Sequence, residues 1–187
     1  RNFEKDGTMD GLIAFEEHWA SERTLGHFAK ANDPDGNWRD VRRRLLDIHD
    51  MRLSEMDRHG VEMTILSLNS PAVQGILDVD EAVETARIAN DSLAEQVAKR
   101  PDRFAGFAAL PMQTADAAIE ELTRCIRDLG FKGAMVNGFT QKNTPDSAIY
   151  YDLPEYRPFW AAIQSLDVPF YIHPRLNIPS RTHAYSG

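Results

Sequence analysis

Five short apolar segments alternate along the chain with longer segments of helical periodicity, and this alternation limits the possible folds more than any other feature. The segments with strand character cover residues 12–18, 61–68, 104–110, 133–137 and 168–173. The segments with apolar residues three or four positions apart cover residues 41–59, 80–100, 114–129 and 153–166, and Thr114 is expected to cap the third of them. Such an order predicts an α/β protein with a parallel sheet and outer helices, either a doubly wound sheet or a (β/α)8 barrel.

The first of these strands ends in two residue types that commonly bind metal ions. Strand side chains point to alternate faces, so we expect Ala14, Glu16 and His18 on one face and the residues between them on the other. Glu16 and His18 would then project side by side from the carboxyl end of a buried strand. The alternative is that they are polar residues leaving a strand for a loop.

The last of the five strands also ends in polar residues, His173-Pro174-Arg175. In parallel α/β proteins, catalytic and binding residues gather at the carboxyl ends of the strands. Polar residues at the ends of both the first and the fifth strand favour the barrel, where distant strands converge at one mouth. His18 and His173 lie 155 positions apart (173 − 18), yet the barrel predicts that they face each other.

Composition excludes several classes of function. With 21 Lys and Arg against 29 Asp and Glu, the net charge is -8, which argues against a nucleic-acid partner. No apolar run approaches the ~18 residues of a membrane helix, so no membrane partner is expected. The glycines do not form the G-x-G-x-x-G pattern, which argues against dinucleotide binding.

The chain has a single cysteine, Cys125, which falls on the apolar stripe of its helix and is therefore expected in the core. A lone cysteine favours a reducing, cytoplasmic setting. The first residues are polar and precede Met9, so we expect residues 1–9 to be a tag or disordered leader. Residues 10–187 are then part of one domain.

Five short stretches resemble the metal-dependent, non-oxidative decarboxylases of the amidohydrolase superfamily, such as the γ-resorcylate and 2,3-dihydroxybenzoate decarboxylases. They are Glu16-Glu17-His18, Ser67-Leu68-Asn69-Ser70-Pro71, Val136-Asn137-Gly138-Phe139, Tyr150-Tyr151-Asp152 and His173-Pro174-Arg175. The resemblance runs from about Gly11 to the last residue, and the combination of stretches is specific. The Glu-x-His pattern alone would not be specific.

The resemblance implies a (β/α)8 TIM barrel of the amidohydrolase type, of which this chain covers about strands 1–5. It also implies one divalent metal ion, zinc or manganese, a small aromatic carboxylate substrate, and a homotetramer or homodimer. The implied reaction is the reversible loss of CO2 from an ortho-hydroxybenzoate such as 2,6- or 2,3-dihydroxybenzoate. The residues that match metal ligands are Glu16, His18 and His173. Asn69, Asn137, Phe139 and Arg175 are candidate substrate-binding residues of the pocket. The alternatives are a turn residue of the loop for Asn137 and a surface salt bridge for Arg175.

The family pattern also includes a later histidine and a metal-binding aspartate that this sequence does not contain. The aspartate is the expected proton donor, so we expect it beyond residue 187, and we expect the 187-residue chain alone to be inactive. Two other functions remain open. One is a metal-dependent hydrolase of the same superfamily, against which Glu16 weighs because many such hydrolases have histidine there. The other is an inactive half-barrel fragment, which would need polar residues along its exposed strand edges.

Overall fold

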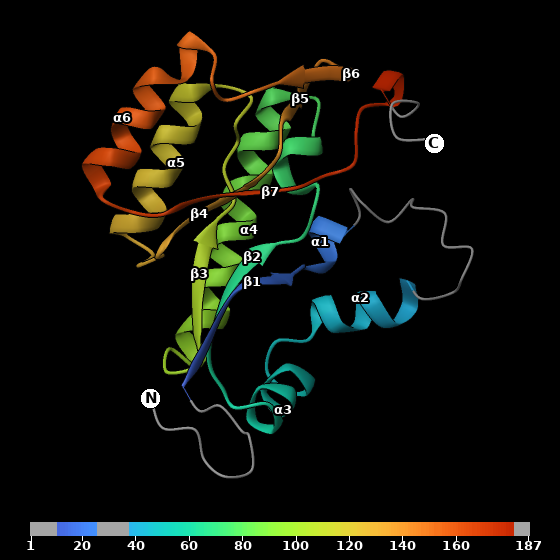
Figure 1. Cartoon of the computed structure of the whole chain (residues 1–187), viewed down its shortest axis with the longest axis vertical. Coiled ribbons are helices and arrows are strands. Elements are labelled where there is room, and N and C mark those ends of the chain that lie inside the picture. The colour runs from blue at the N-terminus through green and yellow to red at the C-terminus, as the bar shows by residue number, and fades with distance from the viewer. Residues whose placement is uncertain (1–10, 26–37, 182–187) are drawn as a thin grey trace.

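A computed structural model describes residues 11–25 and 38–181, and its central feature is a curved sheet of five parallel strands (Figure 1). The strands pair in the order β1-β2-β3-β4-β7. Their bounds are Leu12–Trp19 (β1), Val61–Leu68 (β2), Phe104–Ala108 (β3), Gly133–Asn137 (β4) and Phe170–His173 (β7). The order of all five follows the chain, as the alternation of strands and helices predicts. The expected leader, residues 1–9, lies outside the described residues.

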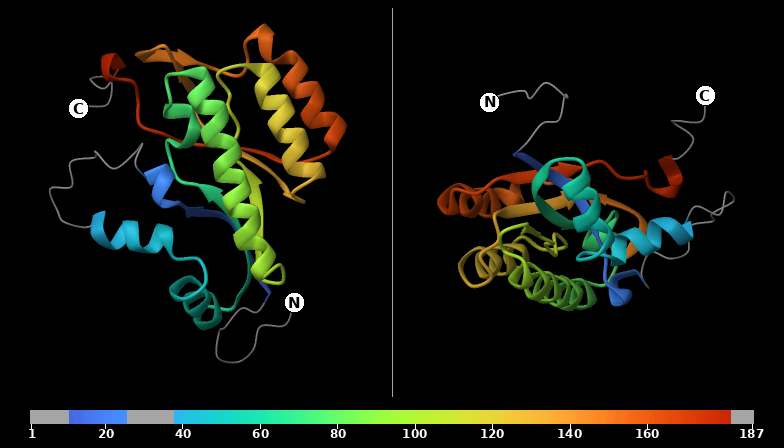
Figure 2. Two further views of the ribbon diagram at one scale, coloured as in Figure 1. Left: turned by 180° about the vertical axis from the view of Figure 1, so that it is seen from behind. Right: turned by 90° about the horizontal axis from the view of Figure 1, so that it is seen from below.

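The longer helices lie along one side of this sheet, as the view from below shows (Figure 2). They are α4 (Val79–Lys99), α5 (Ala115–Arg127) and α6 (Arg157–Leu166). Two of them begin at side chains that accept a hydrogen bond from the first helical turn, Asp78 from the Glu81 amide and Thr114 from the Ala117 amide. The predicted cap at Thr114 is therefore confirmed. No helix in the described ranges is long and apolar enough to cross a membrane.

The helix expected over residues 41–59 is wrong, because the structure has two shorter helices there. These are α2 (Trp38–Leu46) and α3 (Met51–Arg58), and a four-residue helix, α1 (Glu22–Leu25), precedes them. Between α2 and α3, the Asp47 side chain accepts a hydrogen bond from the Arg52 amide. The break also buries Ile48 and lets His49 pack edge-to-face against Phe104. Tertiary packing therefore outweighs the helical periodicity of this segment.

The segment after β4, which reads as a polar loop, contains a hairpin that the sequence interpretation missed. Its strands are β5 (Thr140–Lys142) and β6 (Thr144–Ile149), which pair antiparallel. Asn143 lies between them with a φ of 66°, a left-handed conformation that asparagine adopts more readily than most residues. Two single-turn 3-10 helices, η1 (Ala72–Gly75) and η2 (Pro154–Tyr156), complete the described elements. The second replaces the first turn of the helix expected over residues 153–166.

The main core lies between the sheet and its helices, where Leu66, Leu93, Phe104, Leu122 and Phe159 are almost fully buried. Cys125 belongs to this core, as predicted. Burial raises the pKa of its thiol above the ordinary value, which keeps the thiol protonated.

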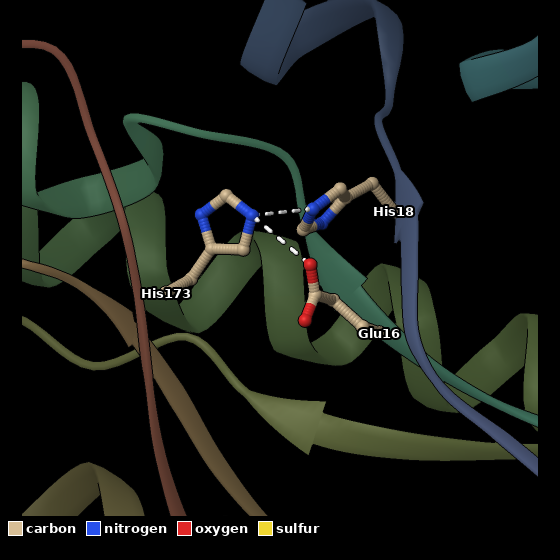
Figure 3. A group of neighbouring side chains, drawn as sticks. All are labelled: Glu16, His18 and His173. Carbon is tan, nitrogen blue, oxygen red and sulfur yellow. Dashed lines mark hydrogen bonds and ion pairs between the residues drawn. The ribbon is translucent and has the colours of Figure 1, made fainter.

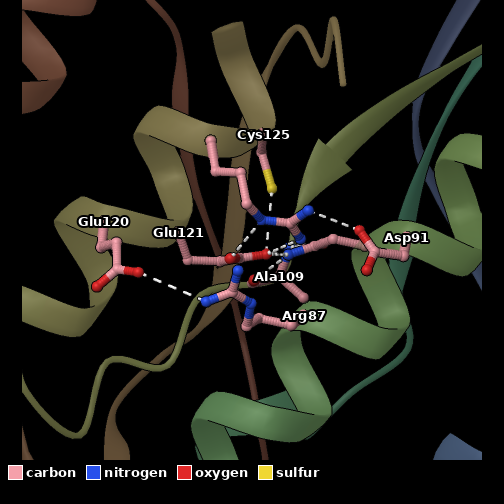
Figure 4. Close-up of polar contacts among 8 residues, drawn as sticks. Arg87, Asp91, Ala109, Glu120, Glu121 and Cys125 are labelled. Atoms are coloured by element: carbon pink, nitrogen blue, oxygen red, sulfur yellow. Dashed lines mark hydrogen bonds and ion pairs between the residues drawn. The ribbon is translucent and has the colours of Figure 1, made fainter. Parts of the chain in front are cut away.

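A buried polar network ties the carboxyl end of β3 to α4 and α5 (Figure 4). Asn90 makes two hydrogen bonds to the backbone of Ala109, to its carbonyl at 2.8 Å and from its amide at 2.9 Å. The same Asn90 side chain donates to the Glu121 carboxylate at 2.7 Å. Arg124 makes two further hydrogen bonds to Glu121, so this buried carboxylate is fully paired. The network fixes where β3 ends.

We expect Asn90→Leu to lower the free energy of unfolding by about 1–3 kcal/mol, because it leaves the buried backbone groups of Ala109 without a partner and removes one of the donors to Glu121. Arg87→Ala is the matched control on the same helix, since Arg87 makes only an exposed 3.5 Å ion pair with Glu120. Chemical denaturation of both variants measures the difference. Equal stability of the two variants would show that the network contributes nothing.

The face of the sheet opposite the helices is partly uncovered. Ile13 and Phe15 on β1 are 60% and 53% exposed. Within the described ranges, β1 and β7 each have a partner strand on one side only. Unpaired edges and exposed apolar side chains favour association with other chains.

A polypeptide restricted to residues 1–187 should therefore self-associate or stay partly folded. Analytical ultracentrifugation and thermal melting followed by circular dichroism test this expectation. A soluble monomer with a sharp, cooperative melt would contradict it and would show that the five-stranded sheet is stable by itself.

Candidate metal centre

Glu16, His18 and His173 meet at the carboxyl ends of β1 and β7 (Figure 3). The Nε2 atoms of the two histidines are 3.2 Å apart, and Glu16 Oε1 lies 3.6 Å from His173 Nε2. One potential ligand atom from each residue lies within 4.8 Å of the others. The predicted facing of His18 and His173 across the fold is thus confirmed.

The side chains of β1 do not alternate as the sequence suggests. The register against β2 slips between Ala14 and Glu17, which is a β-bulge. Ala14, Glu17 and His18 all line a cavity of about 380 Å³ together with residues of α2 and α3. Phe15 and Glu16 both contact Tyr171 of β7 instead. The expected grouping of Ala14 with Glu16 is therefore wrong, while Glu16 and His18 still converge.

Each of the three candidate ligands is held from behind by another side chain. The Nδ1 atom of His18 lies 3.3 Å from the Ser67 hydroxyl, and Nδ1 of His173 lies 3.1 Å from Asn137 Oδ1. The Tyr171 hydroxyl donates to Oε2 of Glu16, which leaves Oε1 nearer to His173. Such outer contacts set the direction in which metal ligands point.

A largely buried arginine anchors the end of β1 that carries these ligands. Arg52 donates to the His18 carbonyl at 2.6 Å and forms a 3.0 Å ion pair with Glu17. Burial lowers the pKa of Arg52 from its ordinary value, but the guanidinium stays charged at neutral pH. The arginine therefore holds the strand end and its bulge against α3.

The donor set suits a divalent cation. Burial and the neighbouring His173 lower the pKa of His18, which favours the neutral imidazole that a metal requires. Two imidazole nitrogens with one carboxylate oxygen match the preferences of zinc and of manganese. Two imidazole nitrogens and a carboxylate oxygen that face one another have more lone pairs than hydrogen atoms between them. A cation therefore satisfies these atoms better than hydrogen bonds among themselves would.

The four residues predicted to contact substrate lie in different environments. Asn69 is 8% exposed, and its Oδ1 has no hydrogen-bond partner among the residues that the structure describes. Asn137 is fully buried and faces His173. Arg175 lies over the ring of the buried Phe139 at 4.3 Å, and its Nη atoms donate to the Gln74 and Phe139 carbonyls and to Gln141. Substrate contact by these residues stays a prediction.

Two residues of this region were missed by the sequence interpretation. Tyr171 precedes His173 by two positions on β7, and period-two alternation on that strand points it to the same face. Gln74 lies in η1 and is 1% exposed, and nothing in its local sequence signals a role.

Comparison with known proteins decides the family. The amidohydrolase family model matches residues 18–184. The chain belongs to the amidohydrolase family. It is 57% identical to the gamma-resorcylate decarboxylase of Polaromonas sp. (strain JS666), over 96% of this chain and 55% of that protein. It is 56% identical to the enzyme of the same name from Rhizobium sp. (strain MTP-10005), over 96% of this chain and 54% of that protein.

Solved structures of the family agree with the fold. A crystal structure of 2,6-dihydroxybenzoate decarboxylase complexed with 2,6-dihydroxybenzoate matches with a TM-score of 0.91 and 56% identity, over 96% of this chain and 55% of that one. The structure of the Polaromonas sp. JS666 dihydroxybenzoic acid decarboxylase, with bound manganese and 2-nitroresorcinol, matches with a TM-score of 0.90 and 57% identity, over 96% of this chain and 54% of that one. The five strands are therefore part of an amidohydrolase-type TIM barrel, as expected, and a doubly wound sheet is excluded. The chain spans about half the length of the curated relatives it matches.

We expect Tyr171→Phe to weaken divalent-metal binding by the native protein about tenfold, because Glu16 loses the donor that orients it. The phenylalanine ring keeps the packing against Phe15. Competition with a chromogenic chelator measures the affinity for Zn²⁺ or Mn²⁺. Tyr150→Phe is the control, because the Tyr150 hydroxyl contacts Arg181 and no candidate ligand. Unchanged affinity in Tyr171→Phe would exclude the orienting role.

Proposed function

We propose that the native protein is a metal-dependent, non-oxidative decarboxylase of ortho-hydroxybenzoates such as 2,6- or 2,3-dihydroxybenzoate. The observation that carries the proposal is the convergence of Glu16, His18 and His173 at the carboxyl ends of β1 and β7. The similarity to gamma-resorcylate decarboxylases supports the choice of reaction. The manganese in the Polaromonas structure supports a divalent ion, with zinc as the other candidate.

A divalent ion bound by these three residues would act as a Lewis acid and template for a carboxylate with a neighbouring phenol oxygen. Glu16 offsets one of its charges, and the imidazoles of His18 and His173 add none. All three side chains serve as ligands, so none of them delivers the proton that the ring carbon takes up when CO2 leaves. The chain residues therefore bind and orient, while proton transfer belongs to another group.

Around the metal, we propose that Asn69, Asn137, Phe139 and Arg175 shape the site for a small aromatic carboxylate. The unpartnered Oδ1 of Asn69 supports a direct contact, because a ring hydroxyl would satisfy a buried acceptor. Arg175 contributes positive charge near the mouth, although neutral acceptors of the protein already hold both of its Nη atoms. Phe139 is buried beneath it and shapes the site indirectly.

The remaining parts of the proposal concern setting and assembly. The native protein would be a homotetramer or homodimer, and the remaining strands of a barrel would cover the exposed apolar side chains of β1. The protonated, buried Cys125 is compatible with a cytoplasmic location. A net charge of -8 supports neither a nucleic-acid nor a membrane partner.

A metal-dependent hydrolase of the same superfamily is the competing function. Glu16 in place of the histidine of many hydrolases weighs against it, and a carboxylate ligand lowers the net charge of the site. Assaying ester and amide substrates beside dihydroxybenzoates separates the two proposals. Turnover of the esters or amides alone would favour the hydrolase.

In the native protein, His173→Ala should abolish release of CO2 from 2,6-dihydroxybenzoate, because it removes a ligand without removing core volume. Its melting temperature should stay close to that of the unmodified protein. His59→Ala is the matched control, since exposed His59 pairs only with Glu55 on the surface of α3. Wild-type turnover of His173→Ala with one metal bound per chain would falsify the role of His173.

A further inference from the structure

The orientation of one buried amide decides which nitrogen of His173 carries its proton. Asn137 lies opposite His173 in the pairing of β4 with β7, and its side chain faces Nδ1 of the imidazole at 3.1 Å. An oxygen at that point accepts a hydrogen bond from a protonated Nδ1 and leaves Nε2 with a free lone pair. An NH2 group at that point would reverse the tautomer and place a proton on Nε2, which faces His18 and Glu16.

The geometry fixes this choice through Gln74, because two backbone groups determine how the Gln74 amide is turned. Its Nε2 lies 2.7 Å from the Leu110 carbonyl, which can only accept. Its Oε1 lies 3.1 Å from the Asn137 backbone amide, which can only donate. Turning the Gln74 amide over would set donor against donor and acceptor against acceptor in a residue that is 1% exposed.

The orientation of the Gln74 amide in turn determines the orientation of the Asn137 side-chain amide. Gln74 Oε1 also lies 3.5 Å from the Asn137 side-chain amide, at the long end of hydrogen bonding. Because that oxygen can only accept, the Asn137 group that faces it is Nδ2. The other end of the Asn137 amide, Oδ1, is therefore the one that faces His173.

We propose that Gln74 and Asn137 are positioning residues that hold His173 in the tautomer with the proton on Nδ1, so that Nε2 is free to bind a metal. The chain of contacts begins at the Leu110 carbonyl, beyond the end of β3, and reaches the metal centre through β4 and β7. The proposal rests on the proposed function in one respect, that His173 is a metal ligand. The tautomer itself is a property of the metal-free protein.

The first measurement is the protonation of His173 in the native protein with ¹⁵N-labelled histidine. Long-range ¹H–¹⁵N correlation spectra of metal-free and Zn²⁺-loaded protein distinguish a protonated ring nitrogen from a free or metal-bound one, and His173→Gln identifies the signals. We expect the proton on Nδ1 in both states. A proton on Nε2 in the metal-free protein would overturn the proposal.

The second measurement compares Gln74→Met with a matched control, Gln113→Met. Gln113 is also buried, at 3% exposed, and donates to the Val73 and Ile76 carbonyls of the same segment, but among the described residues it makes no hydrogen bond to Asn137. Both variants should lose some thermal stability. Only Gln74→Met should give a mixture of His173 tautomers and weaken Zn²⁺ binding, by about tenfold. Equal Zn²⁺ affinities in the two variants would overturn the proposal, because the loss would then be merely structural.

The third measurement is a rescue. Asn137→Asp replaces the amide by a carboxylate, both oxygens of which accept, so its orientation no longer matters. Added to Gln74→Met, it should restore the proton to Nδ1 and recover most of the lost Zn²⁺ affinity. Failure of the rescue in a folded double variant would contradict the proposal. Absence of any divalent-metal binding by the unmodified protein would instead refute the proposed function, and the spectra of metal-free protein would still decide the tautomer.

Discussion

The curvature of the five-stranded sheet is the constraint on which the candidate metal centre depends. β1 and β7 are the two edges of the described sheet and share no backbone hydrogen bonds. Their side chains nevertheless meet, since the rings of His18 and His173 are 4.7 Å apart and those of Phe15 and Tyr171 are 6.0 Å apart. A flat sheet of parallel strands ~4.8 Å apart would separate its two edges by almost 20 Å. The ligands therefore belong to the barrel geometry and not to any local motif.

Within that geometry, the bulge in β1 determines which side chains reach the centre. A regular strand would turn Phe15 and Glu16 to opposite faces. The extra residue brings both of them to Tyr171, while Glu17 turns outward to Arg52. Bulges are common next to active sites because they redirect a side chain without moving the strand. Arg52 stabilises this arrangement by bonding the His18 carbonyl as well as Glu17.

The sequence predicted the elements whose signals are local and repeated. Strand and helix periodicity, the Thr114 cap and the buried stripe that contains Cys125 all depend on neighbours a few positions away. The break between α2 and α3 could not be predicted, because Ile48 leaves the helix for the core and His49 contacts Gln96 of α4 and Phe104 of β3. The convergence of the three candidate ligands was predicted from the barrel topology. The side chains that contact the ligands, and Gln74 behind Asn137, come from other segments of the chain. No spacing in the sequence reveals the distances between these segments.

The same distinction explains why Asn137 and Arg175 look like substrate-binding residues in the sequence. Sequence shows that a side chain is polar or charged at a strand end, but it does not show how many protein acceptors compete for its hydrogen atoms. Arg175 meets three such acceptors, and Asn137 meets Gln74 and His173. Among the described residues, the buried Asn69 Oδ1 and Arg175 Nε have no hydrogen-bond partner, whereas the Asn137 side chain is bonded at both ends. A buried polar atom that the fold leaves unpaired has more to gain from a ligand than one that is already bonded, so Asn69 and Arg175 carry a stronger case for direct contact than Asn137.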